Sequence, residues 1–217
     1  MGVCERRSWL PPLRAAQVGF VAPVGEHLEA QALMLRQGRS VAQVETSLYC
    51  DGALAQRTLW LFGAGRESNG SVAAAIAHGI IQPEDSPQLT ANDMAPAFTA
   101  RMDMRRADPP GGSPPGTIRR WVRLKHRSGL DPVAELVGIG DALPPGSARA
   151  MERMGPISSI TWALTLLGEV PPTREGWWLL ETASNQLGQG FSSETLRLWN
   201  SEGVEVMRGL QSVAVFG

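Results

Sequence analysis

The N-terminal part of the chain reads as strands and turns, because apolar and polar residues alternate over short stretches that end at glycine, proline or aspartate. The pattern predicts strands over residues 17–23, 28–37, 40–50 and 53–63. Asp51-Gly52 is a hairpin signal, because glycine tolerates the positive φ that a tight turn demands. Residues 17–63 are therefore predicted to form an antiparallel meander.

The pattern changes after this meander. Residues 64–95 are rich in Gly, Ser, Ala, Asn and Pro, which predicts a connection over the surface with a short helix from Val72 to His78. Strands are predicted next over residues 97–107 and 118–127, separated by a Pro- and Gly-rich loop. One face of the first of these strands carries Phe98, Met102 and Met104.

A helix is predicted to begin at Asp131-Pro132, because aspartate is a favoured N-cap and proline a favoured first helical residue. The residues up to Ala142 are almost wholly apolar, and Pro144-Pro145 ends the helix. A helix this apolar should be buried against a sheet. Further strands are predicted over residues 157–168, 176–186, 191–200 and 204–217.

The last hairpin repeats the hairpin of the first half. The matched positions are Gln37-Gly38 with Gln189-Gly190, Leu48-Tyr49 with Leu198-Trp199, Gly52 with Gly203, and Arg57 with Arg208. A repeated strand-turn-strand unit predicts two copies of one α+β module. Gln211 falls where the first copy carries Trp60, so a single active site would belong to the second copy.

Composition excludes several classes of protein. The chain has 217 residues, of which 43% are hydrophobic and 19% charged, as expected of a globular protein with a real core. A net charge of −1 and a pI of about 6.3 provide no basic field for nucleic acid. No apolar run approaches the roughly 18 residues of a membrane span. Cys4 and Cys50 form neither a disulfide framework nor zinc spacing, and the N-terminus lacks a signal peptide, which predicts the cytoplasm.

Three polar positions stand in apolar stretches near the C-terminus: Asp141, the hydroxyl run from Ser158 to Thr161, and Gln211. An acid, a hydroxyl and an amide can together hold a water against a carbonyl carbon. No Ser-His-Asp spacing, metal cluster or phosphate loop competes with them. Each also has a plainer interpretation: a carboxylate bonded to backbone at a helix end, ordinary strand hydroxyls, and a structural amide.

The order and spacing of the segments resemble the acyl-CoA thioesterase II family. The matching segments are residues 20–25, 35–52, 98–106, 118–124, 138–145, 158–164, 176–183 and 210–217. The resemblance implies an α+β double hot dog, in which two antiparallel sheets each wrap a buried central helix. It implies a partial hot dog over residues 1–70, a linker over 71–95 and a C-terminal hot dog over 96–217. The first copy is expected to lack its opening strand and helix, and so to expose an apolar face.

The resemblance also implies a reaction, the hydrolysis of acyl-CoA by water. The family's acid and amide correspond to Asp141 and Gln211. The hydroxyl is Ser159 if Ser159-Ile160 replaces the family's Thr-Ile, or Thr161 if the strand is counted back without a gap from Trp177; Ser159 is favoured. No cofactor is implied, acyl-CoA is the expected partner, and a homodimer is expected because sheets of this fold often pair edge to edge.

Two further sets of residues would bind the substrate. The basic run Arg119, Arg120, Arg123, Lys125 and Arg127 would meet CoA phosphates, although such a run is more often a solvated strand face. The apolar set Trp162, Leu164 and Leu166 would favour an acyl chain. The alternative function is a non-catalytic acyl-CoA-binding or assembly module. A hot dog dehydratase is disfavoured because no histidine lies near Asp141.

Overall fold

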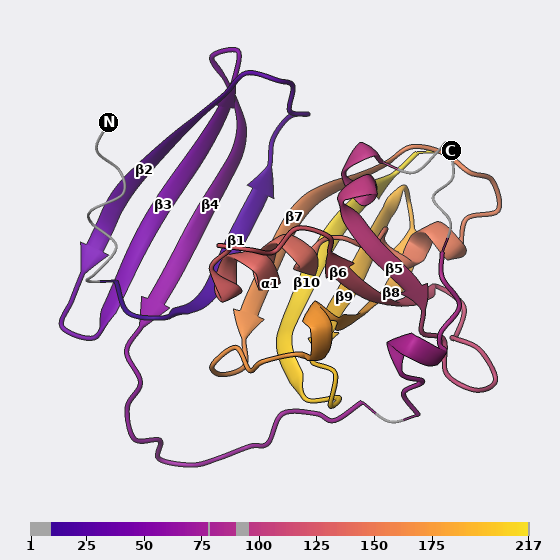
Figure 1. Ribbon diagram of the computed structural model, residues 1–217. Helices are drawn as coiled ribbons and strands as arrows, with labels where there is room; N and C mark the ends of the chain where they lie inside the picture. Colours follow the sequence, from indigo (N-terminus) through magenta and orange to yellow (C-terminus); the bar gives the residue numbers. More distant parts are fainter. Residues whose placement is uncertain (1–9, 78, 90–95, 217) are drawn as a thin grey trace.

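The computed structural model describes residues 10–77, 79–89 and 96–216, which form one ten-stranded antiparallel sheet and one α-helix (Figure 1). The strands are β1 (Leu13–Phe20), β2 (Leu28–Gln37), β3 (Val41–Cys50), β4 (Ala53–Gly63), β5 (Met102–Arg106), β6 (Thr117–Leu124), β7 (Ile157–Leu166), β8 (Trp178–Gly188), β9 (Phe191–Trp199) and β10 (Glu205–Val215). The helix is α1 (Pro132–Gly140), and the 3-10 turns are η2 (Pro83–Asp85), η3 (Ala97–Arg101), η4 (Gly146–Arg149) and η5 (Arg174–Gly176). None of the helices in these ranges is long and apolar enough to cross a membrane.

The strand order is β2-β3-β4-β1-β7-β10-β9-β8-β6-β5. At its centre β1 pairs with β7, and Val18 lies opposite Trp162. Read outward from this junction, β1-β4-β3-β2 corresponds to β7-β10-β9-β8, as expected of a repeated unit. The expectation of two separate sheets is corrected here: β1 and β7 join the halves into one sheet, because their pairing satisfies backbone groups that two free edges would leave open.

The predicted hairpin between β3 and β4 is confirmed. Asp51 has a φ of 49° and Gly52 a φ of 80°. The same conformation recurs between β8 and β9, where Gln189 has a φ of 54° and Gly190 a φ of 77°. Two successive positive φ angles give a tight turn whose twist fits the flanking strands.

Helix α1 begins where the capping signals predicted. The Asp131 carboxylate accepts hydrogen bonds from the backbone N–H groups of Val133 at 2.9 Å and Ala134 at 3.0 Å. Pro132 occupies the first helical position, where its missing N–H costs nothing. Two of the free donors at the start of the helix are thereby satisfied.

One face of α1 packs on the inner face of the sheet. Leu136 and Ile139 are both fully buried, at 0% exposure. They join a core that includes Val18, Val122, Leu164, Leu198 and Met207. Burial of each large aliphatic side chain is worth about 1.5–3 kcal/mol, so this apolar contact holds the helix in place.

The connection after β4 runs past one end of the sheet to the second half (Figure 1). The predicted helix from Val72 is wrong in the residues described: the segment is extended, and Ile76 forms a β-bridge with Val204. The backbone N–H of Ala77 donates to the carbonyl of Gly203 at 2.8 Å. An extended backbone can bond to the β9–β10 turn in this way, whereas a helix would use these groups internally. His78 lies outside the described residues.

The same connection covers a second apolar cluster on the outer face of the sheet. The cluster contains Ala107, Trp121, Trp177, Leu179 and Trp199. Ala77 and Ile80 of the connection pack against it, and the indole N–H of Trp121 donates to the carbonyl of Ile81 at 2.8 Å. The connection is therefore bound to the second half along this face.

The strand predicted over residues 97–107 is shorter than expected. Ala97–Arg101 forms the 3-10 turn η3, and β5 begins at Met102. Phe98 is 45% exposed within that turn, so it does not share a strand face with Met102 and Met104.

The inner face of β2, β3 and β4 continues the face that α1 covers in the second half. It carries Met34, Val44, Leu48 and Trp60, each of them partly exposed. The one α-helix in the described ranges packs on β6 and β9 instead. The first half therefore presents apolar side chains on this face.

The close contact between α1 and the sheet predicts opposite effects for two glycines of the helix. A Cβ at Gly140 would lie 2.3 Å from Met207 Cε and 3.1 Å from Trp162 Cζ2, whereas a Cβ at Gly138 would have nothing within 4 Å. We expect Gly140→Ala to lower the free energy of unfolding by about 1–3 kcal/mol through overpacking. Gly138→Ala should raise it by about 0.5–1 kcal/mol through helix propensity. Urea denaturation measures both, and equal shifts would contradict the close approach.

Candidate active site

Asp141 closes the C-terminus of α1 at the point where the helix touches the sheet. It is the C-cap residue, and its backbone N–H donates to the carbonyl of Ile139. Gly140 precedes it, and the lack of a side chain there lets the helix end approach the Trp162 ring and Met207. The Asp141 carboxyl is thereby brought down to the inner face of β7 and β10.

Gln211 holds this carboxyl from the sheet. It lies on β10 opposite Trp162 of β7 and is 4% exposed. Its amide Nε2 donates to Asp141 Oδ1 at 3.0 Å and to Ser159 Oγ at 2.8 Å. A primary amide has two N–H donors, so both are used. One side chain therefore joins the acid and the hydroxyl.

Ser159 reaches Gln211 because β7 contains a bulge. Thr161 and Ser159 lie opposite consecutive residues of β10, Ser212 and Val213, so Ile160 has no partner. An extra residue in one strand reverses which side chains face inward beyond it. On one side of the bulge the buried residues of β7 are even-numbered, and on the other side the odd-numbered Ser159 turns inward.

The structure does not bring Thr161 or Ser158 to this cluster. Both side chains are exposed. The backbone of Thr161 pairs with Gly19 of β1 and with Ser212 of β10, which places its side chain on the outer face. Asp141, Ser159 and Gln211 thus come together from three separate elements.

Burial changes the acidity of Asp141. Loss of solvent raises the pKa of Asp141 from 3.8 to about 6, and the hydrogen bond from Gln211 opposes this rise. A carboxylate with such a pKa is mostly ionised at neutral pH and is a stronger base than an exposed one. A perturbed acid beside a hydroxyl and an amide is typical of a catalytic site.

The apolar residues expected around an acyl chain are packing residues in the structure. Trp162, Leu164 and Leu166 are 5%, 2% and 6% exposed and belong to the main core. Trp162 lies between the end of α1 and Gly209 of β10, and its indole N–H has no hydrogen-bond partner in the part of the chain that the structure describes. The three side chains therefore pack within the core, and Trp162 lies against the end of α1 that carries Asp141.

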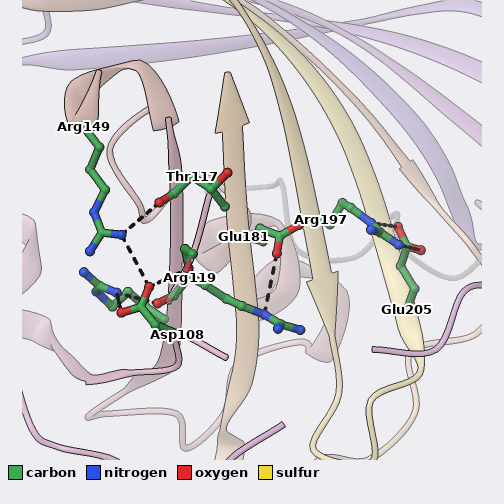
Figure 2. A network of polar contacts seen from close by, with 9 residues as sticks. Asp108, Thr117, Arg119, Arg149, Glu181, Arg197 and Glu205 are labelled. Carbon is green, nitrogen blue, oxygen red and sulfur yellow. Dashed lines mark hydrogen bonds and ion pairs between the residues drawn. The ribbon is translucent and has the colours of Figure 1, made fainter. Parts of the chain in front are cut away.

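The basic run expected to meet phosphates is held by partners within the protein. The contacts are Arg119 with Glu181 at 3.6 Å, Arg120 with Asp108 at 3.1 Å, Arg123 with Asp103 at 2.9 Å, Arg127 with Glu135 at 4.0 Å, and Lys125 Nζ with the carbonyl of Ala100 at 2.8 Å. Figure 2 shows Arg119 directed at Glu181 on the neighbouring strand. Arg119 and Arg123 lie over Trp199 and Trp177 on the outer face of the sheet, whereas Arg127 pairs with Glu135 of α1. Because each of these cations has a partner within the protein, the geometry does not support the expected role of the run toward phosphates.

No metal arrangement is found among the described residues, where no three His, Cys, Asp or Glu side chains gather in one place. Cys50 is half-buried, and its Sγ accepts the backbone N–H of Gly25 at 3.1 Å. Cys4 lies outside the described residues. The thiol of Cys50 is a local contact of the β3–β4 hairpin.

Glu194 is a buried acid beside the cluster that the sequence did not single out. It lies on β9 opposite Gln211 and is 0% exposed. Its carboxylate accepts the backbone N–H groups of Gly146 at 2.8 Å and Ser147 at 3.2 Å. The alternation of β9 could have revealed it, because Glu194 has the same inward parity as the buried Leu196.

Residues 82–215 match the family model of the acyl-CoA thioesterase C-terminal domain. A proposed thioesterase from Novosphingobium aromaticivorans superposes with a TM-score of 0.80 and 28% identity, over 95% of this chain and 81% of that one. A hot dog fold protein from Alicyclobacillus acidocaldarius superposes with a TM-score of 0.83 and 21% identity, over 98% and 82%. The acyl-CoA thioesterase II TesB2 from Mycobacterium marinum superposes with a TM-score of 0.73 and 16% identity, over 94% of this chain and 80% of that one. The fold is that of the hot dog proteins. No curated protein matches the sequence.

The burial of Asp141 predicts how Asp141→Asn changes stability with pH. The pKa of Asp141 is about 6 in the folded state against 3.8 ordinarily, so the folded state holds the proton more tightly. The parent therefore loses stability as pH rises between these values, whereas asparagine has no charge to desolvate. The free energy of unfolding of the variant, relative to that of the parent, should rise by about 1–3 kcal/mol between pH 4 and pH 8. Urea denaturation of both proteins at each pH measures the difference, and a constant difference would show that no buried charge forms at Asp141.

Proposed function

The chain belongs to the acyl-CoA thioesterase family, and we propose that it hydrolyses an acyl-CoA thioester to a free acid and CoA. The observation that carries the proposal is the pair of hydrogen bonds from Gln211 to Asp141 and Ser159. These bonds bring together an acid at the end of α1, an amide on β10 and a hydroxyl on β7. They are the same three residue types, in the same chain order, that the family resemblance implies.

In the proposed reaction a water held by Asp141, Ser159 and Gln211 attacks the thioester carbonyl carbon. The new C–O bond forms as the Asp141 carboxylate takes a proton from the water, and the carbonyl electron pair moves onto oxygen. The C–S bond then breaks as the C=O bond re-forms, and the departing CoA sulfur takes up the proton. Ser159 and Gln211 orient the water, and a backbone N–H near α1 would stabilise the oxyanion. Because a thiolate is a good leaving group, no covalent intermediate on the protein is needed.

We also propose that the chain is a double hot dog whose first copy is incomplete. The boundaries are a partial hot dog over residues 1–70, a linker over 71–95 and a complete C-terminal hot dog over 96–217. The matching strand order on either side of the β1–β7 junction supports the duplication. The packing of α1 on β6 and β9 supports the assignment of the complete copy to the C-terminal half.

Asp141→Asn tests the proposed reaction. The assay is release of free thiol from a panel of acyl-CoAs with short, long and aromatic acyl groups. The parent should turn over part of the panel, and the variant should lose about 10²–10⁴-fold in kcat because the general base is gone. Asp131→Asn is the matched control: the same substitution at the other end of α1 keeps a good N-cap and should leave kcat within about twofold.

Equal turnover by the parent and Asp141→Asn would overturn the role of Asp141. If the parent releases no thiol across the panel, hydrolysis fails as the function. Calorimetric titration with the same acyl-CoAs then decides whether the chain is a non-catalytic acyl-CoA-binding module.

The choice of hydroxyl is tested separately. Ser159→Ala removes the group bonded to Gln211 and should lower kcat by roughly tenfold to a hundredfold, because the water loses one of the groups that orient it. Ser158→Ala and Thr161→Val alter exposed side chains of the same strand and should stay within about twofold of the parent. A larger loss in Thr161→Val than in Ser159→Ala would reassign the hydroxyl.

A further inference from the structure

Glu194 is a buried acid whose side-chain oxygens accept three hydrogen bonds. Its carboxylate accepts from the backbone N–H groups of Gly146 and Ser147 and from Ser192 Oγ at 2.5 Å. A carboxylate without such partners would be costly to bury, so these donors are what permit an acid at 0% exposure. Two of the three donors belong to η4, the turn that follows α1 and Asp141 along the chain.

The segment between Asp141 and η4 is stiff. It contains Pro144-Pro145, whose rings fix the backbone φ. The carbonyl of Pro144 accepts a hydrogen bond from Thr182 Oγ1 at 2.8 Å. Gly146 is pressed against the sheet so closely that a Cβ there would lie 2.1 Å from the carbonyl oxygen of Gly116. A displacement of the turn would therefore be transmitted back to Asp141.

The two ends of the segment from Asp141 to Gly146 are bound by side chains that are neighbours on the sheet. Gln211 and Glu194 are cross-strand partners of β10 and β9, so one holds Asp141 and the other holds Gly146. The outer end of η4 is anchored as well, because Arg149 bonds to the carbonyl of Thr117 at 3.0 Å and to Asp108 at 3.4 Å (Figure 2).

The first half of the chain provides an internal comparison. There Trp60 stands at the position of Gln211, and its cross-strand partner on β3 is Val44. In the second half the cross-strand partner of Gln211 on β9 is Glu194. The second half therefore pairs the buried acid Glu194 with Gln211, which binds Asp141. The first half has the apolar Val44 and Trp60 at the corresponding positions.

We propose that Glu194 is a positioning residue, which fixes the turn after α1 and through it the place of the Asp141 carboxyl. This proposal rests on the proposed function, in which Asp141 acts on the water. Glu194 itself does not touch the reacting atoms; it holds the backbone that carries the base.

The test is Glu194→Gln, in the parent and in an Asp141→Asn background. The two N–H groups of η4 are accepted by different oxygens of Glu194, and an amide replaces one of these oxygens by an NH2 group, which can only donate and so cannot accept the N–H that faces it. We expect kcat to fall roughly tenfold to a hundredfold with KM within about twofold of the parent, because the base is misplaced and not removed. In the Asp141→Asn background the same substitution should cause no further loss, because its effect passes through Asp141.

Glu205→Gln is the matched control. Glu205 is also buried on the same sheet, but it is paired with Arg197 on the outer face (Figure 2) and with Arg208. Its substitution should lower Tm and leave kcat unchanged. Two outcomes would overturn the proposal and leave Glu194 a stabilising residue. One is that Glu194→Gln lowers kcat by the same factor in the Asp141→Asn background; the other is that Glu205→Gln lowers kcat as much as Glu194→Gln does.

A measurement without substrate separates this proposal from the proposed function. NMR titration of the Asp141 side-chain carboxyl carbon should give a pKa of about 6 in the parent. In Glu194→Gln and in the charge-neutral Thr182→Val, which frees the Pro144 carbonyl in the same segment, the pKa should fall as the loosened segment admits water. If the parent hydrolyses nothing, this titration alone decides the role of Glu194, and an unchanged pKa in both variants overturns it.

Discussion

The register of β10 between its two neighbours is the constraint on which the site depends. Backbone pairing sets Gln211 opposite Trp162 of β7 on one side and opposite Glu194 of β9 on the other. A slip of one residue would turn Gln211 to the outer face and separate it from Asp141. The core under α1 is built from the same strands, so the helix end and the amide are positioned by one set of hydrogen bonds. Backbone pairing within the sheet therefore fixes where the side chains of the site lie.

The two buried acids beside Gln211 differ in how fully they are satisfied. Glu194 accepts three hydrogen bonds, two of them from backbone N–H groups. Asp141 accepts one from the Gln211 amide, and burial raises its pKa. Both oxygens of the first acid are occupied by donors, which suits it to holding its neighbours in place. The second is held with less support, and the free energy of that burial is what makes it reactive toward a proton.

Local signals were sufficient for many of the elements. The cap at Asp131 and the turn at Asp51-Gly52 follow from short stretches of sequence, whereas Asp141 and Gln211 were proposed from their apolar surroundings together with the family resemblance. The hydroxyl could not be chosen between Ser159 and Thr161 by counting, because the bulge in β7 depends on its pairing with β10. The single sheet was missed for a related reason: β1 and β7 are far apart in sequence, and no local pattern records their pairing. The extended connection after β4 likewise takes its form from partners elsewhere in the chain.

The junction between β1 and β7 makes the two halves interdependent. Ala16 and Val18 of β1 lie within the same core as α1, so the first half contributes apolar contacts to the second. The family match over residues 82–215 contains β7 but not the strand that pairs with its free side. The second half alone would expose an unpaired backbone edge and an open corner of its core, which are the features that lead sheets to aggregate. We therefore expect the C-terminal half to fold cooperatively with the N-terminal half, which supplies no group to the proposed reaction.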